Sequence, residues 1–412
     1  MKAIATILIF ISTLAHARSI TLPKDAAGGA YRPMLDMNGV DTIVLKGKYK
    51  NVELAYYGIW GSPSKKIVIK SDPIDSASIS GYGPYCMLIN GEYFIIDGLK
   101  FTGFDTVFTA TGLGIFESSN IEVRNCLFYQ LQAGIVQNPI ASRDMENNYF
   151  HDLVFVNFRN PANGGRTECF YLGNTKQTSP GKFRRCRLAN IYIYDVSGDG
   201  IQLCQGSDFD LRNITIIKWG QAQLKEQRYG ILIGNEANAN IQDVLFDSGR
   251  GQAFQFLGTG RNSLKRATFR NIDLSGLVNE DVVYIRARSG DFFIDFSLST
   301  FLNCRTDRKL IYNATPDSLT SGSIFCSNIG VEPPQTVLNK KDIWGCISLP
   351  IPEAPKPKPE TRQRKDVTIY NNIYQLMGER KQVYVDEVIR QLQPQRIYIL
   401  FYDKKFHLIN KP

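Results

Sequence analysis

The chain has 412 residues and a formal net charge of +9, and it is rich in Tyr and Phe. Six of the nine positive charges come from residues 1–17 and 349–412, so the part between them carries too little charge to indicate a nucleic-acid partner, and an acidic ligand is not implied. His151 is the single histidine between residues 18 and 366, which argues against a histidine triad or a zinc centre. We expect His151 in a turn.

The first residues have the pattern of a secretory signal peptide. Met1-Lys2 precedes an apolar run from Ala3 to Leu14, and Ala15-His16-Ala17 is a small-residue cleavage site. The run is too short to span a bilayer, and no later segment approaches the roughly 20 apolar residues of a transmembrane helix. We therefore expect residues 1–17 to be removed and the chain to be exported without a transmembrane segment.

Short segments of alternating small and large residues recur along the chain. One set has Gly, Ala or Cys at its second position and Ile or Phe at its third, and its members begin at Leu113, Ala133, Glu168, Asp199, Tyr229 and Gln252. A second set has apolar residues at positions one and six, and its members begin at Val123, Met145, Phe183, Leu211, Ile241 and Leu264. The alternation is typical of β-strands, and the Asn or Asp that recurs at position three of the second set suits bends.

Each of the two sets of segments recurs once per repeat. This predicts a chain that winds through equivalent strands in every coil, with each strand stacked about 4.8 Å from its equivalent in the preceding coil. The repeat takes 20 residues from Gly114 to Gly134 and 30 from Gly200 to Gly230, which indicates loops inserted between strands. We predict an all-β, right-handed parallel β-helix of three sheets and about nine coils over residues 18–348. A β-sandwich would need hairpin signals at short spacing, which the sequence lacks.

The sequence changes character after the repeats. Alternating prolines over residues 349–366 predict an extended linker. Residues 367–412 do not continue the repeat and are predicted to form a small C-terminal β-rich domain, with a helix possible over Val383–Gln391.

The C-terminal segment resembles a diverged sorting domain of the Bacteroidota type IX secretion pathway. The resemblance rests on three blocks, Val367–Asn371, Leu392–Leu400 and Lys404–Lys411. Arg396 and Ile397 stand where that family has Gly before Tyr, and a generic appended domain is the alternative. The resemblance implies a protein that is secreted or held at the surface of a bacterium.

Eight cysteines in an exported chain permit disulfides, but they lack the dense spacing of a disulfide-stapled small fold. We expect thiols that stack inward in the β core, with disulfides left open as the alternative. The positions are Cys86, Cys126, Cys169, Cys186, Cys204, Cys304, Cys326 and Cys346.

Three early segments, Thr42–Leu54, Lys66–Ser71 and Phe94–Leu99, resemble the opening coils of the pectate-lyase-like β-helix proteins, including the chondroitinase B and alginate lyase group. With the repeats, the resemblance covers about three quarters of the chain. It implies the fold, and it implies a polysaccharide substrate only loosely, because function depends on a site carried by the fold.

One enzyme motif is partly present. Ser197–Cys204 is similar to the Gly-Asp-Asp-Cys-Ile-Ala-Ile block of polygalacturonases, and Arg228–Gly234 is similar to their Gly-His-Gly-Ile-Ser-Ile-Gly block. Asp199 matches the second aspartate, but Gly198 stands in place of the first and Tyr229 in place of the histidine. An inverting hydrolase of that type would lack its carboxylate pair.

Stacking of the repeats predicts one polar column with a rung about every 4.8 Å, which consists of Glu168, Asp199, Tyr229 and Gln252. Two carboxylates at that spacing suit a retaining glycosidase, and they also suit a Ca²⁺ site to which Asp195 would contribute. The structural alternative is that Asp199 caps the turn before Gly200 and that Glu168 pairs with Arg166 or Arg228.

A lyase needs a base, often Lys or Arg in this fold group, and the candidates are Arg228, Arg286, Arg288 and Lys176. The alternative for each of these residues is a solvated or ion-paired charge on the protein surface. The fourth position of the first set could stack sugar rings or lie beneath loops, and it consists of Tyr171, Gln202, Leu232, Gln255, Ile285 and Tyr312. We expect Trp60 and Trp219 to pack in the core or under loops.

The sequence thus favours a secreted polysaccharide lyase or glycosidase that acts, as a monomer, on an extracellular, uronate-containing polymer. The predicted catalytic residues are Glu168, Asp199, Arg228 and Tyr229. The predicted substrate-binding residues are Tyr171, Gln202, Gln255, Arg286 and Arg288, and the predicted calcium ligands are Glu168, Asp195 and Asp199. A non-catalytic glycan-binding or adhesin-like β-helix is the alternative, and the signal peptide disfavours a phage tailspike.

Overall fold

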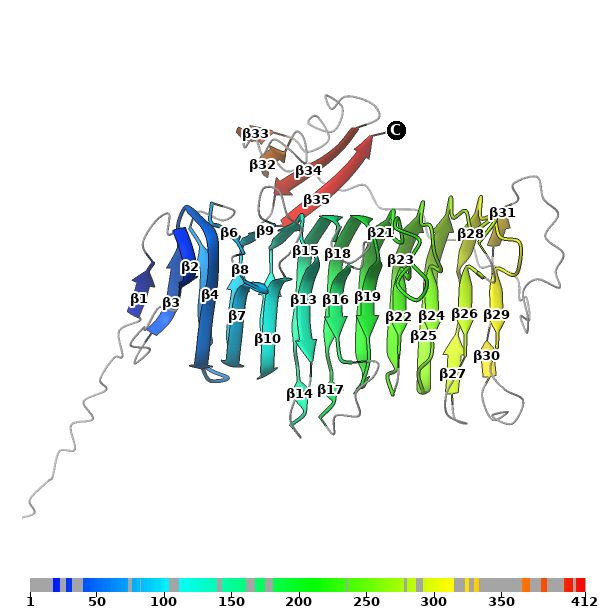
Figure 1. The fold of residues 1–412 in the computed structure, drawn as a ribbon, viewed down its shortest axis with the longest axis horizontal. Coiled ribbons are helices and arrows are strands. Elements are labelled where there is room, and N and C mark those ends of the chain that lie inside the picture. Colours follow the sequence, from blue (N-terminus) through cyan, green and yellow to red (C-terminus); the bar gives the residue numbers. More distant parts are fainter. Residues whose placement is uncertain are drawn as a thin grey trace, which may run out of the picture.

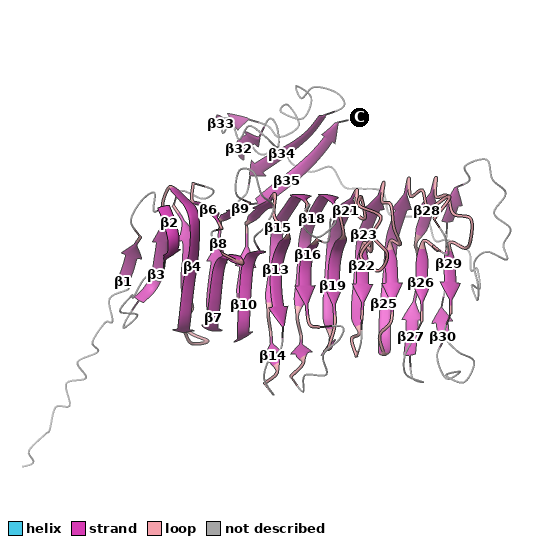
Figure 2. Cartoon of the chain, viewed as in Figure 1, coloured by secondary structure: helices cyan, strands magenta, loops and turns pink. Residues whose placement is uncertain are grey.

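We analysed a computed structural model of the chain. It describes residues 18–22, 27–31, 40–72, 76–81, 83–103, 111–138, 143–160, 167–174, 181–234, 236–277, 280–286, 292–314, 323–325, 330–332, 365–370, 379–383, 396–402 and 405–411. Regular structure in these residues consists of β-strands (Figure 2). None of them forms a helix of the length and hydropathy needed to span a membrane.

The chain winds as a right-handed parallel β-helix, with strands from successive coils side by side along its length (Figure 1). Three parallel stacks make up the body. Stack 1 contains β2 (Ala27–Tyr31), β4 (Lys48–Trp60), β7 (Tyr85–Glu92), β10 (Thr111–Ser119), β13 (Ala133–Asn138), β16 (Glu168–Leu172), β19 (Asp199–Leu203), β22 (Ile231–Ile233), β24 (Phe254–Phe256), β26 (Val283–Ile285) and β29 (Ile311–Asn313).

Stacks 2 and 3 follow stack 1 in each coil. Stack 2 contains β1 (Arg18–Thr21), β3 (Val40–Leu45), β5 (Ile67–Ser71), β8 (Phe94–Asp97), β11 (Glu122–Arg124), β27 (Phe292–Asp295) and β30 (Ser323–Phe325). Stack 3 contains the start of β4, β6 (Ser78–Ser80), β9 (Lys100–Thr102), β12 (Leu127–Tyr129), β28 (Thr300–Leu302) and β31 (Gly330–Glu332). Five strands bend through both stacks: β15 (Tyr149–Phe158), β18 (Arg187–Val196), β21 (Phe209–Ile217), β23 (Ala239–Asp247) and β25 (Gly260–Arg270).

On consecutive coils in the middle of the helix, the bend between stacks 2 and 3 is made by a residue with a positive φ. Asp152 (54°), Asn190 (54°) and Asn213 (54°) occupy it on consecutive coils. Their side chains bond along the stack, since Asn190 Nδ2 donates to Asp152 Oδ1 (2.9 Å) and Asn213 Nδ2 donates to Asn190 Oδ1 (2.8 Å). Asn and Asp tolerate this left-handed conformation better than most residues, and the ladder bonds fix the corner.

The interior is filled by apolar columns that repeat once per coil. Phe128 stacks on Phe101 and Phe155, with ring centroids 4.8 and 4.7 Å apart. A Cβ at Gly112 or Gly134 would lie within 2.6 Å of the Phe128 or Phe155 ring. The small second position predicted for the first set of segments is therefore a space that the phenylalanine column fills.

The six described cysteines are buried and are not in disulfides, as predicted; Cys326 and Cys346 lie outside the described residues. Trp219 is fully buried and its Nε1 donates to the carbonyl of Gln252 (3.1 Å). The prediction for Trp60 is wrong, because its side chain ends β4 with 55% of its surface exposed.

The registers predicted for stack 1 need two corrections. Leu113 pairs with Ile135 rather than with Ala133, so the first segment starts two residues earlier, at Thr111. Tyr284 rather than Ile285 follows Gln255 in stack 1.

The second set of segments mixes two bends. Val123 pairs with Phe150, which pairs with Leu188, so Met145 and Phe183 do not belong to its column. They begin a separate short stack of β14 (Met145–Glu146), β17 (Phe183–Arg184) and β20 (Gly206–Ser207). Both bends use residues with positive φ next to buried apolar residues, which makes them alike in sequence.

Stack 1 holds eleven of the described strands, so the prediction of about nine coils is too low. The first coils lack the sequence repeat from which the number of coils is predicted. The C-terminal segment forms a small antiparallel sheet, as predicted, in the order β33 (Glu379–Val383), β32 (Lys365–Tyr370), β34 (Arg396–Tyr402) and β35 (Lys405–Lys411). The predicted signal peptide, residues 349–364 of the linker and residues 384–391 of the possible helix lie outside the described residues.

Candidate functional site

The predicted polar column exists. Glu168 begins β16 and pairs with Asp199, which begins β19. The pairs Ile201 with Ile231 and Ile231 with Phe254 carry the same register forward, which places Tyr229 and Gln252 on the next two rungs. One more coil adds Asp281, two residues before Val283.

Asp199 lies inside this column, with 1% of its surface exposed. Its Oδ1 accepts a hydrogen bond from the backbone N–H of Tyr229 on the next coil (2.7 Å), and its Oδ2 has no hydrogen-bond partner. Burial, and secondarily the charge of Glu168, raise the pKa of Asp199 well above its usual range. The carboxyl group therefore bridges two coils and favours its protonated form.

Glu168 is half-buried, and Gln227 Nε2 donates to its Oε1 (3.2 Å). Gln227 comes from the loop between β21 and β22, which folds back over the column. The two carboxyl groups are thus adjacent but unequal, since one is in the interior and the other is partly open to solvent. Unequal environments of this kind separate the pKa values of paired carboxyl groups.

Arg228 and Tyr229 are both 8% exposed. The Arg228 guanidinium pairs with Glu280 Oε1 (2.5 Å) and donates to the carbonyl of Gln223 (3.2 Å). Burial raises the pKa of the Tyr229 phenol. Both side chains are buried, and their catalytic roles remain predictions.

Two of the predicted calcium ligands, Asp195 and Asp199, bond to different groups of the protein. Asp195 Oδ1 is bound by the Arg159 guanidinium, while Asp199 accepts the Tyr229 N–H. The described residues contain no group of three or more His, Cys, Asp and Glu side chains placed to share a metal ion. Ca²⁺ takes six to eight oxygen ligands, and Asp195 and Asp199 each already bond to another group, so they do not form a calcium site by themselves.

The predicted sugar-binding strip lies on the outer face of stack 1. Tyr171 pairs with Gln202, and the column continues through Leu232. Its later rungs are Gln255, Tyr284 and Tyr312. Tyr171, Gln255, Tyr284 and Tyr312 are each partly exposed, whereas Gln202 is 5% exposed.

Cations lie at the far end of this strip. Arg308 and Lys309 lie over the Tyr312 ring, 4.9 and 5.1 Å from its centroid. Arg286 follows β26 and is exposed. Arg288, Lys176 and Arg166 lie outside the described residues.

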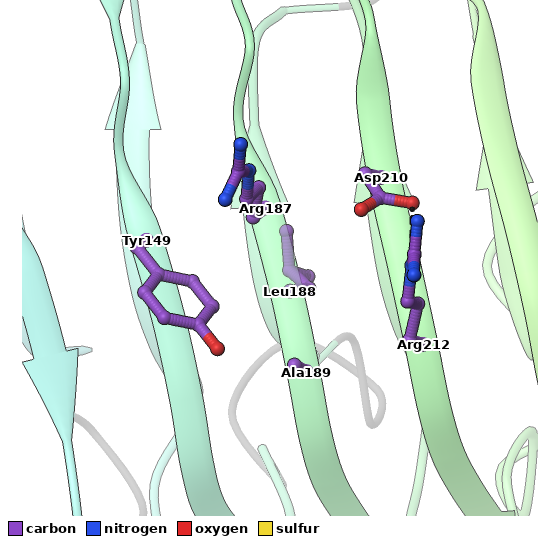
Figure 3. A pocket seen from close by; sticks show the side chains of 6 residues that line it. All are labelled: Tyr149, Arg187, Leu188, Ala189, Asp210 and Arg212. Carbon is purple, nitrogen blue, oxygen red and sulfur yellow. Dashed lines mark hydrogen bonds and ion pairs between the residues drawn. The ribbon is translucent and has the colours of Figure 1, made fainter.

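The sequence did not reveal a second feature, a hollow on the outer face of stack 2 (Figure 3). It has a volume of about 300 Å³ and is lined by Tyr149, Arg187, Leu188, Ala189, Asp210 and Arg212. These residues come from three neighbouring coils on β15, β18 and β21. The one sequence signal for it is the small Ala189 between His151 and Arg212 in an otherwise long-chain column, and it is visible only once the register is known.

His151 stands beside this hollow, on β15 rather than in the predicted turn. Its Nδ1 lies 2.6 Å from Asp152 Oδ2 and its Nε2 lies 3.2 Å from Glu122 Oε1. Burial lowers the pKa of His151, but the hydrogen bonds to these two carboxylates outweigh it, and the pKa is raised overall. Its hydrogen bond is the largest cause that lowers the pKa of Glu122, to about 2.

The fold and the site define a right-handed parallel β-helix protein. Residues 87–271 match the family model described as the right handed beta helix region. No curated protein sequence matches the chain.

Among solved structures, the chain is similar to three β-helix proteins at low identity. An alginate lyase from Paenibacillus sp. str. FPU-7 has 15% identity and a TM-score of 0.49, with 76% of this chain and 99% of that one covered. Pectate lyase Pel9A has 13% identity and a TM-score of 0.43, with 68% and 77% covered. The Siphovirus 9NA tailspike receptor binding domain has 10% identity and a TM-score of 0.46, with 98% and 89% covered.

Proposed function

We propose that the protein acts on an extracellular polysaccharide that lies along the outer face of stack 1. The observation that carries the proposal is the column from Tyr171 to Tyr312, which presents a partly exposed tyrosine or glutamine on four of six consecutive coils. Aromatic faces and amides are the groups that hold sugar rings by stacking and by hydrogen bonds to hydroxyls. One rung about every 4.8 Å suits an extended polymer better than a compact ligand.

The polymer that we propose contains uronates. Lys309 at Tyr312 and the exposed Arg286 place cations beside the strip, and Arg308, which also pairs with Asp281 (3.6 Å), lies over the same tyrosine ring. Guanidinium and ammonium groups bind carboxylates strongly when they are close to them. A uronate polymer would therefore bind here more tightly than a neutral one.

For the reaction, we propose cleavage by a lyase or glycosidase in which Glu168 and Asp199 form the acid–base pair. The raised pKa of Asp199 beside a partly exposed Glu168 is what favours this role. Asp199 is buried, so this role requires its carboxyl group to become accessible to the substrate. The second candidate function is a secreted, non-catalytic glycan-binding protein, and the burial of Asp199 and the Arg228–Glu280 pair favour it.

The test uses the purified chain with pectins, alginates and glycosaminoglycans, with and without calcium. Absorbance from unsaturated uronates indicates a lyase, and new reducing ends without that absorbance indicate a hydrolase. Retention on immobilised polymer is measured in parallel, with Tyr284→Ala and Tyr312→Ala as variants in the strip. Binding without product on any polymer would support the non-catalytic alternative, and no binding to any polymer would refute the proposal.

A further inference from the structure

The hollow on stack 2 is formed by a missing side chain. Tyr149, Arg187 and Asp210 follow one another in one outward column, and His151, Ala189 and Arg212 follow one another in the next. The methyl group of Ala189 leaves a gap between the two long side chains above and below it. The recess at this gap has a volume of about 300 Å³, and Figure 3 shows the side chains around it.

Of the charged side chains around the hollow, two form an ion pair with each other and the third, Arg187, does not. Arg212 Nε donates to Asp210 Oδ1 (3.1 Å), and Asn240 Nδ2 donates to the same oxygen (3.3 Å). Arg187, in contrast, has no ion pair or side-chain hydrogen bond within the described part of the chain, and it is exposed. The hollow therefore offers a free guanidinium next to a neutralised Asp210–Arg212 pair.

The opposite wall is aromatic and firmly held. Tyr149 stacks on His151, with ring centroids 4.1 Å apart and planes 24° apart. His151 is fixed by Asp152 and Glu122, and Glu122 is bound in turn by Arg124 (2.7 Å). A wall whose position is set by such bonds loses little conformational entropy when a ligand packs against it.

We propose that this hollow binds one carboxylated sugar unit of a polysaccharide. The carboxylate pairs with the fork of Arg187, the sugar ring packs on the face of Tyr149, and ring hydroxyls bond to Asp210 and Arg212. The choice of a sugar as ligand rests on the proposed function. The site itself is separate from the stack 1 strip, since its residues lie on stack 2.

The test is titration of the full chain with oligogalacturonate and with a neutral oligoglucan, followed by calorimetry and by the NMR signal of the His151 ring. Arg187→Gln removes the guanidinium, and Ala189→Leu fills the gap. Arg250→Gln is the matched control, because Arg250 is also exposed and has no ion pair among the described residues. We expect Arg187→Gln and Ala189→Leu each to weaken oligogalacturonate binding about tenfold and Arg250→Gln to leave it unchanged.

The outcomes separate this site from the stack 1 strip. Normal oligogalacturonate affinity in Arg187→Gln, equal losses in Arg187→Gln and Arg250→Gln, or a His151 signal that does not shift would each overturn the hollow as a binding site. Equal affinity for the neutral oligoglucan would overturn the carboxylate assignment. Polymer retention that is lost in Tyr284→Ala but kept in Arg187→Gln would support the proposed function and refute this site.

Discussion

The carboxyl group of Asp199 accepts the backbone N–H of Tyr229 across two coils of the helix, at 2.7 Å. A bond of this kind ties a side chain on one coil to the backbone of the next. It makes Asp199 part of the stacking as well as a candidate acid. Substitutions at Asp199 should therefore report on stability and on activity separately.

Asp199→Asn should stabilise the protein at neutral pH. The folded-state pKa of Asp199 is raised above 3.8, so the folded chain binds this proton more tightly than the unfolded chain, and stability declines as pH rises above 3.8. Asparagine removes the ionisable group and keeps an oxygen for the Tyr229 N–H. We expect a gain of about 1–2 kcal/mol in the free energy of unfolding at pH 7, and no gain below pH 3.8.

Urea unfolding at pH 3.5 and pH 7 measures this difference. Glu168→Gln is the companion variant, because it removes the neighbouring charge, which is the smaller cause of the raised pKa. It should give a smaller gain than Asp199→Asn. A loss of stability in Asp199→Asn at pH 7 would show that the carboxylate is bound by a cation in solution. If the proposed chemistry holds, both variants lose activity.

The stabilisation from His151 should depend on pH. The raised pKa of His151 makes its contribution complete below pH 6.5 and lost as pH rises through the folded-state value. The lowered pKa of Glu122 makes its contribution complete above pH 4.5 and lost as pH falls toward about 2. Both are in place between pH 4.5 and 6.5, where His151→Gln should cost about 1–2 kcal/mol.

Chemical denaturation of wild type and His151→Gln at pH 3, 5.5 and 9 tests this window. The difference between the two proteins should be largest at pH 5.5 and smaller at both other values. A difference that is the same at all three pH values would mean that His151 contributes by packing on Tyr149 alone. An NMR titration of the ring gives the pKa directly.

The bend at Asn190 gives a prediction about backbone strain. Asn190 has φ of 54° and bonds through its side chain to Asp152 and Asn213. Asn190→Ala loses both bonds and keeps the strain, whereas Asn190→Gly loses the bonds and relieves the strain. We expect a cost of about 2–3 kcal/mol for alanine and about 1 kcal/mol less for glycine, measured by urea unfolding. Equal costs would contradict a role for φ.

The two tryptophans should respond in opposite ways to truncation. Trp219 is fully buried against Phe246, and Trp219→Ala should cost about 3–5 kcal/mol. Trp60 is 55% exposed, and Trp60→Ala should change stability by less than about 0.5 kcal/mol. Thermal unfolding of the two variants beside wild type measures both. A large loss in Trp60→Ala would indicate that a partner or a loop covers this side chain.

The fold could be predicted from the sequence because each coil repeats the same inward residues. The pairing of Glu168 with Asp199 was predicted correctly, since both precede a small residue and a buried Ile or Phe. The register failed at Met145 and Phe183, where a second bend has the same composition as the first. Local pattern sets which residues face inward, and it does not tell one corner of a coil from another.

The environment of the predicted residues could not be read from the sequence. Arg228 pairs with Glu280, 52 residues away, and Gln227 reaches Glu168 from a loop whose path depends on tertiary packing. The hollow on stack 2 is equally non-local. Tyr149, Arg187 and Asp210 are far apart in sequence and meet because loops of different length bring three coils into line.

Ala189 shows how little change such a scaffold needs to acquire a cavity. Each outward column receives one side chain per coil, so shortening one of them hollows the surface without moving the backbone or the core. Two substitutions in one column can then move a recess by one coil: a larger residue fills the old recess, and a smaller residue on the next coil opens a new one. A protein built in this way can gain, lose or move a surface recess while its folding core stays the same.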